Sequence, residues 1–244
     1  MLACALGIIM LWPGQKEPEY QGKRLSEWAA LERERPTEAS DAVLAIGTNG
    51  LATMIAWIDY DVPRWHKPLL RMALHIPANS VWHNRIYRWL GEQGLNTRVQ
   101  NAGFCFRVLG EQGSPAIPEL KRLIRDGRSI RPGCAADALT HMEGAGVLAL
   151  VEVLSDRSLG TPSRNATTSA LRYVTYRGPE LKKAVPVLVS CLHDTNVWVQ
   201  SFAAQALGNF GCGHKQAVPA LAELTSSSDP NCRIFAARAH AGLR

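Results

Sequence analysis

The sequence predicts an all-α protein, an α-solenoid of about five or six repeats of two helices each. Two near-duplicate stretches, KKAVPVLVSC and KQAVPALAEL, begin at Lys182 and Lys215, 33 residues apart. Periods of 20–50 residues are typical of repeat architectures. After Thr37, apolar residues recur at helical spacing almost without interruption, and no stretch alternates with the two-residue period of a strand. We therefore expect stacked helices and no sheet.

Two segments precede the repeats. Residues 1–15 form a short apolar segment, in which the uncharged run from Leu2 to Trp12 has 11 residues, fewer than the about 20 that span a bilayer. We interpret it as a truncated signal anchor, or else as a buried helix or frayed tail. The first interpretation favours a membrane-anchored or exported protein over a cytoplasmic one. Residues 16–37 are a polar lead-in, where Ser26 is expected to cap a short helix that Pro36 ends.

The repeats occupy residues 38–244, degenerate over 38–100 and clearer over 101–244. A leucine marks the second helix of each clear unit, at positions spaced by 30, 32 and 36 residues: Leu109, Leu139, Leu171 and Leu207. His240 takes the same position 33 residues further on. Around Leu207, apolar residues recur at i, i+3, i+4 and i+7, which predicts one buried helix face.

Prolines are expected to mark helix starts. Pro118, Pro186 and Pro219 each follow an apolar residue at the opening of a first helix. Proline costs about 3 kcal/mol inside a helix, but in the first turn its missing N–H removes no hydrogen bond. Asp229 and Pro230 are expected to serve as the N-cap and first residue of the final helix.

The A-V-P-x-L openings, the A-x-x-A-L-G second helix and the aspartates at Asp194 and Asp229 resemble HEAT repeats of the bacterial, HEAT-like kind. The resemblance covers roughly residues 38–244. It implies a solenoid whose second helices line the concave face, and it implies no particular chemistry. A non-enzymatic scaffold or adaptor for protein–protein interaction is the function we expect from it.

The sequence offers no catalytic, cofactor-binding or metal-binding residue. It contains no G-x-x-x-x-G-K-[ST], G-x-S-x-G or H-E-x-x-H motif, and its six cysteines form no C-x-x-C pair. HEAT-like hydroxylases bind iron through His-Glu pairs, and bilin lyases share the scaffold. None of the seven histidines is followed by Glu, so we do not expect an enzyme. A HEAT-like lyase-type activity stays an alternative.

A basic and aromatic segment supplies a further alternative. The chain has a formal charge of +6, and no acid occurs between Asp61 and Glu92. The basic residues of this window are Arg64, Lys67, Arg71, Arg85 and Arg88. Basic residues interleaved with aromatics can bind phosphates and stack bases, so residues 64–88 are a candidate site for nucleic acid or another anionic surface. They also fit a solvated face over buried tryptophans.

The repeat register predicts a second candidate surface. Residues two positions before or after the marking leucine point away from the apolar stripe, toward the expected concave side. Trp198, on the helix that contains Leu207, points the same way, and it also fits a cover over a neighbouring helix. The predicted partner-binding residues are Trp198, Gln205, Asn209, Tyr173, Arg107 and Arg238. Neither of these two positions keeps the same residue in every repeat, unlike repeat proteins in which each unit reads one base. Polar groups with an occasional aromatic suit a protein partner, and membrane contact is expected only through the N-terminal segment.

Overall fold

The computed structural model describes residues 17–60, 92–127, 131–156, 158–210 and 217–242. Its elements in chain order are β1 (Glu19–Tyr20), β2 (Lys23–Arg24), α2 (Leu25–Ala30), η1 (Leu31–Arg33), α3 (Pro36–Ile46), η2 (Gly47–Gly50), α4 (Leu51–Asp59), α7 (Glu92–Leu109), η3 (Gly110–Ala116), α8 (Ile117–Asp126), α9 (Arg131–Thr140), α10 (Glu143–Leu154), α11 (Thr161–Tyr173), α12 (Leu181–Cys191), α13 (Val197–Phe210), α14 (Val218–Leu224) and α15 (Pro230–Gly242). The η elements are 3₁₀-helices. The apolar N-terminal segment, the basic segment 64–88 and Gly211 lie outside the described residues.

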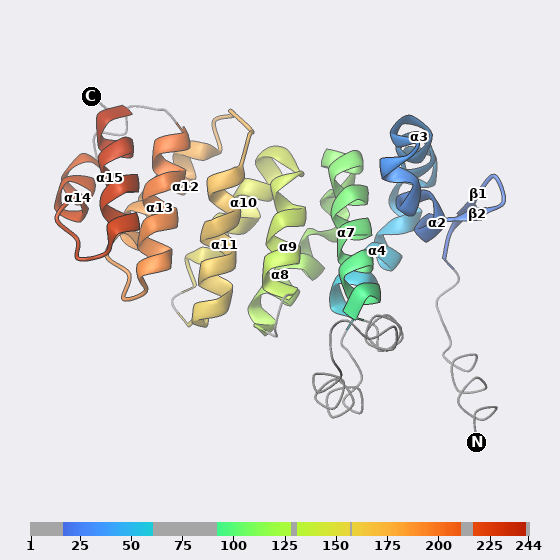
Figure 1. The fold of residues 1–244 in the computed structure, drawn as a ribbon, viewed down its shortest axis with the longest axis horizontal. Helices are drawn as coiled ribbons and strands as arrows, with labels where there is room; N and C mark the ends of the chain where they lie inside the picture. Colours follow the sequence, from blue (N-terminus) through green and yellow to red (C-terminus); the bar gives the residue numbers. More distant parts are fainter. Residues whose placement is uncertain (1–16, 61–91, 128–130, 157, 211–216, 243–244) are drawn as a thin grey trace, which may run out of the picture.

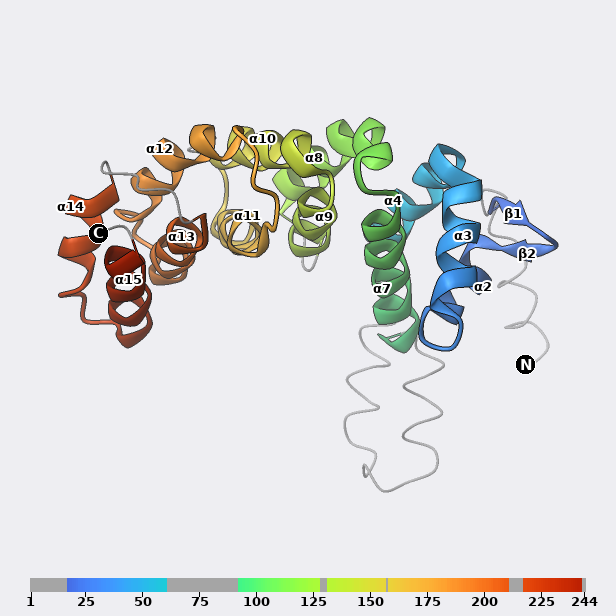
Figure 2. The ribbon, with the colours of Figure 1, turned by 90° about the horizontal axis from the view of Figure 1, so that it is seen from above.

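The helices form two rows that bend into an arch. In Figures 1 and 2, α7, α9, α11, α13 and α15 stand side by side in an inner row, and α8, α10, α12 and α14 form an outer row. Each inner helix from α7 to α13 packs on the next inner helix, and each from α9 to α15 also packs on an outer helix. The inner row lines the concave side of the arch (Figure 2). The predicted all-α solenoid is confirmed, and its second helices form the inner row.

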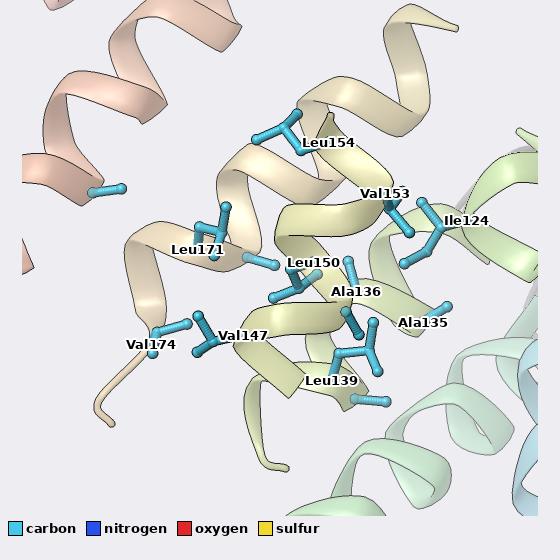
Figure 3. Packing of buried hydrophobic residues seen from close by; sticks show 14 of the residues in the cluster. Ile124, Ala135, Ala136, Leu139, Val147, Leu150, Val153, Leu154, Leu171 and Val174 are labelled. Atoms are coloured by element: carbon cyan, nitrogen blue, oxygen red, sulfur yellow. The ribbon is translucent and has the colours of Figure 1, made fainter. Parts of the chain in front are cut away.

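The core runs continuously between the two rows. Leu139 of α9, Leu150 of α10 and Leu171 of α11 are fully buried and lie close together in Figure 3. The other two leucines that mark the repeat, Leu109 and Leu207, are buried as well. Because each unit buries its apolar face against its neighbours, stability in such an array comes from stacking as much as from each unit alone.

A small β-hairpin precedes the helices, so the expectation of no strand was wrong. β1 and β2 pair antiparallel, and Gln21 and Gly22 between them have φ of 48° and 76°. A two-residue turn with both φ values positive matches the twist of a hairpin. The indole N–H of Trp28 donates to the Tyr20 carbonyl at 2.9 Å, which holds the hairpin on α2. Strands of two residues are too short to show alternation.

Two predictions about the lead-in were also wrong. Ser26 is not the cap of α2, because Arg24 is the N-cap residue and its N–H donates to the Glu27 carboxylate at 2.8 Å. The Ser26 hydroxyl instead donates to Glu17 at 2.6 Å. Pro36 does not end this helix, since it is the first residue of α3. Its fixed φ favours a helix start there, as at the later prolines.

Most of the predicted proline starts are confirmed. Pro118 and Pro219 lie in the first two positions of α8 and α14. Pro230 is the first residue of α15, and Asp229 caps that helix by accepting the Cys232 N–H at 2.8 Å. The proline ring therefore removes no intrahelical hydrogen bond at these three positions.

Pro186 is the exception, because α12 begins five residues earlier at Leu181. Leu181 and Ala184 are buried on the core side, so packing draws the preceding turn into the helix. The first turn is closed by short i to i+3 bonds, such as that from the Lys182 N–H to the Pro179 carbonyl at 3.1 Å. Burial here outweighs the cost of a proline inside the helix.

The run Pro36–Asp59 is, among the described residues, long and apolar enough to cross a membrane, with a mean hydropathy of 1.4. Half of that stretch is buried in the fold. Gly47, at φ 57°, separates α3 from η2 and α4. The core helices at the start of an array meet the same criterion of length and composition.

Candidate interaction surface

Helix α13 presents one polar and aromatic stripe to solvent. Its members, at spacings of four, three and four residues, are Trp198, Phe202, Gln205 and Asn209. The remaining faces of α13 pack on α11, α12 and α15, so its solvent face is the one that looks into the concavity. The stripe therefore lies where the register predicted it.

Four side chains of α11 and α13 form an aromatic–arginine stack: Tyr173, Arg172, Phe202 and Trp198. The Arg172 guanidinium lies 4.4 Å from the Tyr173 ring centroid and 4.2 Å from that of Phe202. The Trp198 ring packs on Phe202 with centroids 5.8 Å apart. The two outer rings stay largely in water, Tyr173 being 62% and Trp198 54% exposed. A contiguous set of this kind differs from single surface aromatics, which are common on protein surfaces.

Hydrogen bonds hold the stack in place. Arg172 donates to the Gln205 side-chain oxygen at 3.2 Å and to the Tyr173 hydroxyl at 2.6 Å. The Asn209 amide donates to the Arg172 carbonyl at 2.7 Å. The Arg172 Nε atom is buried and has no hydrogen-bond partner among the described residues. Gln205 and Asn209 thus join α11 to α13 through one half of each amide, and the Gln205 nitrogen and the Asn209 oxygen have no hydrogen-bond partner among the described residues.

A shallow groove of about 160 Å³ continues the surface toward α15. Gln205, Asn209 and Arg238 line it, together with Phe235. Its floor is narrow because the two helices approach closely: a Cβ atom at Gly208 would lie 3.2 Å from the α carbon of Ala239 on α15. Five of the six predicted residues therefore lie along three adjacent inner helices.

Arg107, the sixth predicted residue, lies apart from the others. It belongs to α7 and lines an open pocket of about 550 Å³ formed with η1 and α9. Its guanidinium is ion-paired with Glu32 and lies 5.7 Å from the Phe104 ring centroid. The structure does not bring Arg107 to the stack, so it is a separate candidate contact.

Residues 185–243 match the family model of HEAT repeats. They include most of α12 and all of α13, α14 and α15, and they contain the stripe and the groove. The HEAT fold is typical of protein-interaction scaffolds.

Three engineered proteins of known structure are similar to this chain. A designed armadillo repeat protein shares 18% identity at a TM-score of 0.44, over 80% of this chain and 100% of that one. An engineered protein shares 17% identity at a TM-score of 0.47, over 90% of this chain and 96% of that one. Another designed armadillo repeat protein, in complex with peptide (KR)4, shares 16% identity at a TM-score of 0.47. The match covers 91% of this chain and 100% of that one. No curated protein sequence matches the chain.

The sequence prediction missed two members of the stack. Arg172 directly follows Leu171, the marking leucine of its repeat, so the rule of two positions before or after did not include it. Phe202 was assigned to the buried stripe of α13, but it is only half-buried. The four-residue spacing of Trp198 and Phe202 was the available signal, because residues four apart on a helix are neighbours.

The titratable groups of the chain show no activated nucleophile among the described residues. Burial raises the pKa of all four described cysteines, that of Cys105 to about 12 and that of Cys191 to about 11. Reactive thiols have lowered pKa values, so these act as small apolar groups. Burial lowers the pKa of His141, which lies in the larger pocket, while Asp137 opposes that shift. Within the described ranges no His, Cys, Asp and Glu group could hold a metal ion.

Proposed function

We propose that this protein is a non-enzymatic scaffold that binds a protein partner through the concave surface of its HEAT array. The exposure of Tyr173 and Trp198 on adjacent inner helices is the observation that carries this proposal. Tryptophan, tyrosine and arginine are the residues most enriched at interface hot spots. The stack also holds the rings before any partner arrives, which lowers the entropy lost on binding.

The chemistry of the surface supports binding over catalysis. The stack and groove present rings, amides and guanidinium groups, and none of these is a good general acid or base near neutral pH. The lyase-type alternative would rely on the separate pocket beside Arg107, whose lining includes the titratable groups Glu32, Asp137 and His141. That pocket is lined by residues of α2, η1, α7 and α9, whereas the stack belongs to α11 and α13.

Site-directed cross-linking tests the proposal. A photoreactive residue placed at Trp198 should capture the partner in an extract of the native cells, whereas one placed at the exposed Ser190 of outer helix α12 should not. Trp198→Ala should weaken binding of the captured partner by more than about 1 kcal/mol and leave helicity nearly intact. The neighbouring Val197→Ala, at a residue 40% exposed, is the matched control and should change little.

Two results would count against the concave surface. Cross-linking from Ser190 alone would move the interface to the outer row. Loss of binding in the double variant Arg85→Glu and Arg88→Glu, with Trp198→Ala silent, would instead support the anionic-surface alternative at residues 64–88. That alternative also predicts a steep fall of affinity with salt.

A further inference from the structure

Helices α11, α13 and α15 contain no aspartate or glutamate within their bounds. Their cationic residues are all arginines: Arg164, Arg172, Arg233 and Arg238. The nearest acids on neighbouring helices are Asp137 of inner helix α9, Glu143 and Glu152 of α10 and Glu223 of α14. Within α11, α13 and α15 themselves, the charged side chains are therefore all positive.

Two of these four arginines are already engaged in the fold. Arg164 is bonded to Asp194, with its Nε atom 2.9 Å from a carboxylate oxygen. Arg233 donates to the main-chain carbonyls of Ser227 and Ser228 at 2.9 and 2.8 Å. These two side chains stabilise the turns between helices and offer little to a ligand.

The other two arginines keep their charge for a partner. Arg172 is bonded to uncharged oxygens only, those of Gln205 and Tyr173, so among the described residues no acid neutralises it. Arg238 is exposed and makes no hydrogen bond or ion pair within the described part of the chain. It borders the groove that Gln205 and Asn209 also line. An uncompensated positive charge thus lies at each side of those two amides.

We propose that the partner segment bound here is acidic, with one or two carboxylates beside an aromatic or large apolar side chain. This inference rests on the proposed scaffold function and names the chemistry of its partner. A carboxylate pairs with Arg238, since arginine and carboxylate form strong charge-assisted hydrogen bonds. The apolar side chain packs on the exposed rings of Trp198 and Tyr173. The free halves of the Gln205 and Asn209 amides bond the main chain of the segment.

The sparse charge favours a peptide over nucleic acid as the occupant. Affinity for nucleic acid comes from neutralising many phosphates, usually six or more in a typical site. The three inner helices contain no lysine, and of their three arginines without an acid partner among the described residues, only Arg172 and Arg238 lie at the stack and the groove. Two positive charges flanking a pair of amides suit one or two carboxylates on a polypeptide.

Random dodecapeptides displayed on phage, selected on the full chain, test the inference. Selected sequences should combine Asp or Glu with a neighbouring Trp, Phe, Tyr or Leu. A synthetic peptide of the selected sequence should bind about tenfold more tightly than its Gln and Asn counterpart. Arg238→Glu should bind the selected acidic peptide about tenfold more weakly than the unaltered chain does. The same variant should regain that affinity toward a peptide in which Lys replaces the acid. Lys182→Glu, the same charge change at an exposed residue of outer helix α12, is the matched control and should have no effect.

The other outcomes separate the inference from the function on which it rests. Equal binding of basic or uncharged peptides, still weakened by Trp198→Ala, would overturn the acidic segment and leave the scaffold in place. Peptide binding that Trp198→Ala does not change would overturn the concave site itself. Tighter binding of an oligothymidylate than of any selected peptide, lost in Arg238→Glu, would assign the surface to nucleic acid. Arg238→Gln, with circular dichroism, shows whether a loss comes from charge or from misfolding.

Discussion

Leu207→Ala should lower the free energy of unfolding by about 3 kcal/mol. Leu207 is fully buried in α13, which packs on α11, α12 and α15. The substitution removes three carbon atoms, worth about 2 kcal/mol at roughly 0.8 kcal/mol per buried methylene. A cavity of roughly 40 Å³ that the neighbours fail to fill adds about 1 kcal/mol. Because stacking supplies much of the stability of an array, the loss should spread to both neighbouring units.

Urea unfolding followed by far-ultraviolet circular dichroism measures the free energy, and hydrogen exchange locates it. Amide protection should fall in α11 and α15 as well as in α13. Leu44→Ala is the matched control, since Leu44 on α3 is 44% exposed and should cost well under half as much. A loss below about 1 kcal/mol, or a loss of protection confined to α13, would refute this account of how the units support one another.

Two further predictions concern buried polar groups. Asp194→Asn should cost about 2 kcal/mol in the same urea assay, because the half-buried Arg164 loses its charged partner, and equal stability of the variant would contradict that role. Burial, and to a lesser extent the negative charge of Glu32, raises the pKa of the Cys105 thiol to about 12 from an ordinary value of 9.0. The stability that this thiol contributes is therefore complete below pH 9 and is lost as pH rises toward 12. Between about pH 8 and about pH 10.5, Cys105→Ala should lose about 2 kcal/mol less stability than the wild-type chain, and parallel pH profiles would be the contrary result.

The repeat fold could be predicted because its signal recurs. Leu139, Leu171 and Leu207 repeat at a period that only stacked units explain, and each is buried as expected. The exceptions come from single local events. The start of α12 before Pro186 depends on burial of Leu181, and a proline rule contains no information about that burial.

For the candidate surface, the sequence predicted which residues of one helix face solvent, but it did not predict contacts between neighbouring helices. Register placed Trp198, Gln205 and Asn209 on the solvent face of α13, where they lie. The bonds that Arg172 makes across to α13 depend on the rotation between successive units, which a repeat period does not specify. For the same reason the register could not separate Arg107 from the other five residues.

Packing and recognition use different positions of the repeat, and this separation bears on how the protein can evolve. The marking leucine is kept in four successive units, whereas the position of Gln205 holds Arg107, Asp137, Ser169 and Arg238 in the others. A substitution at such a position changes what the inner face can hold and leaves the buried leucines untouched. Natural selection can therefore redirect the array to a new partner one unit at a time, with little penalty in folding.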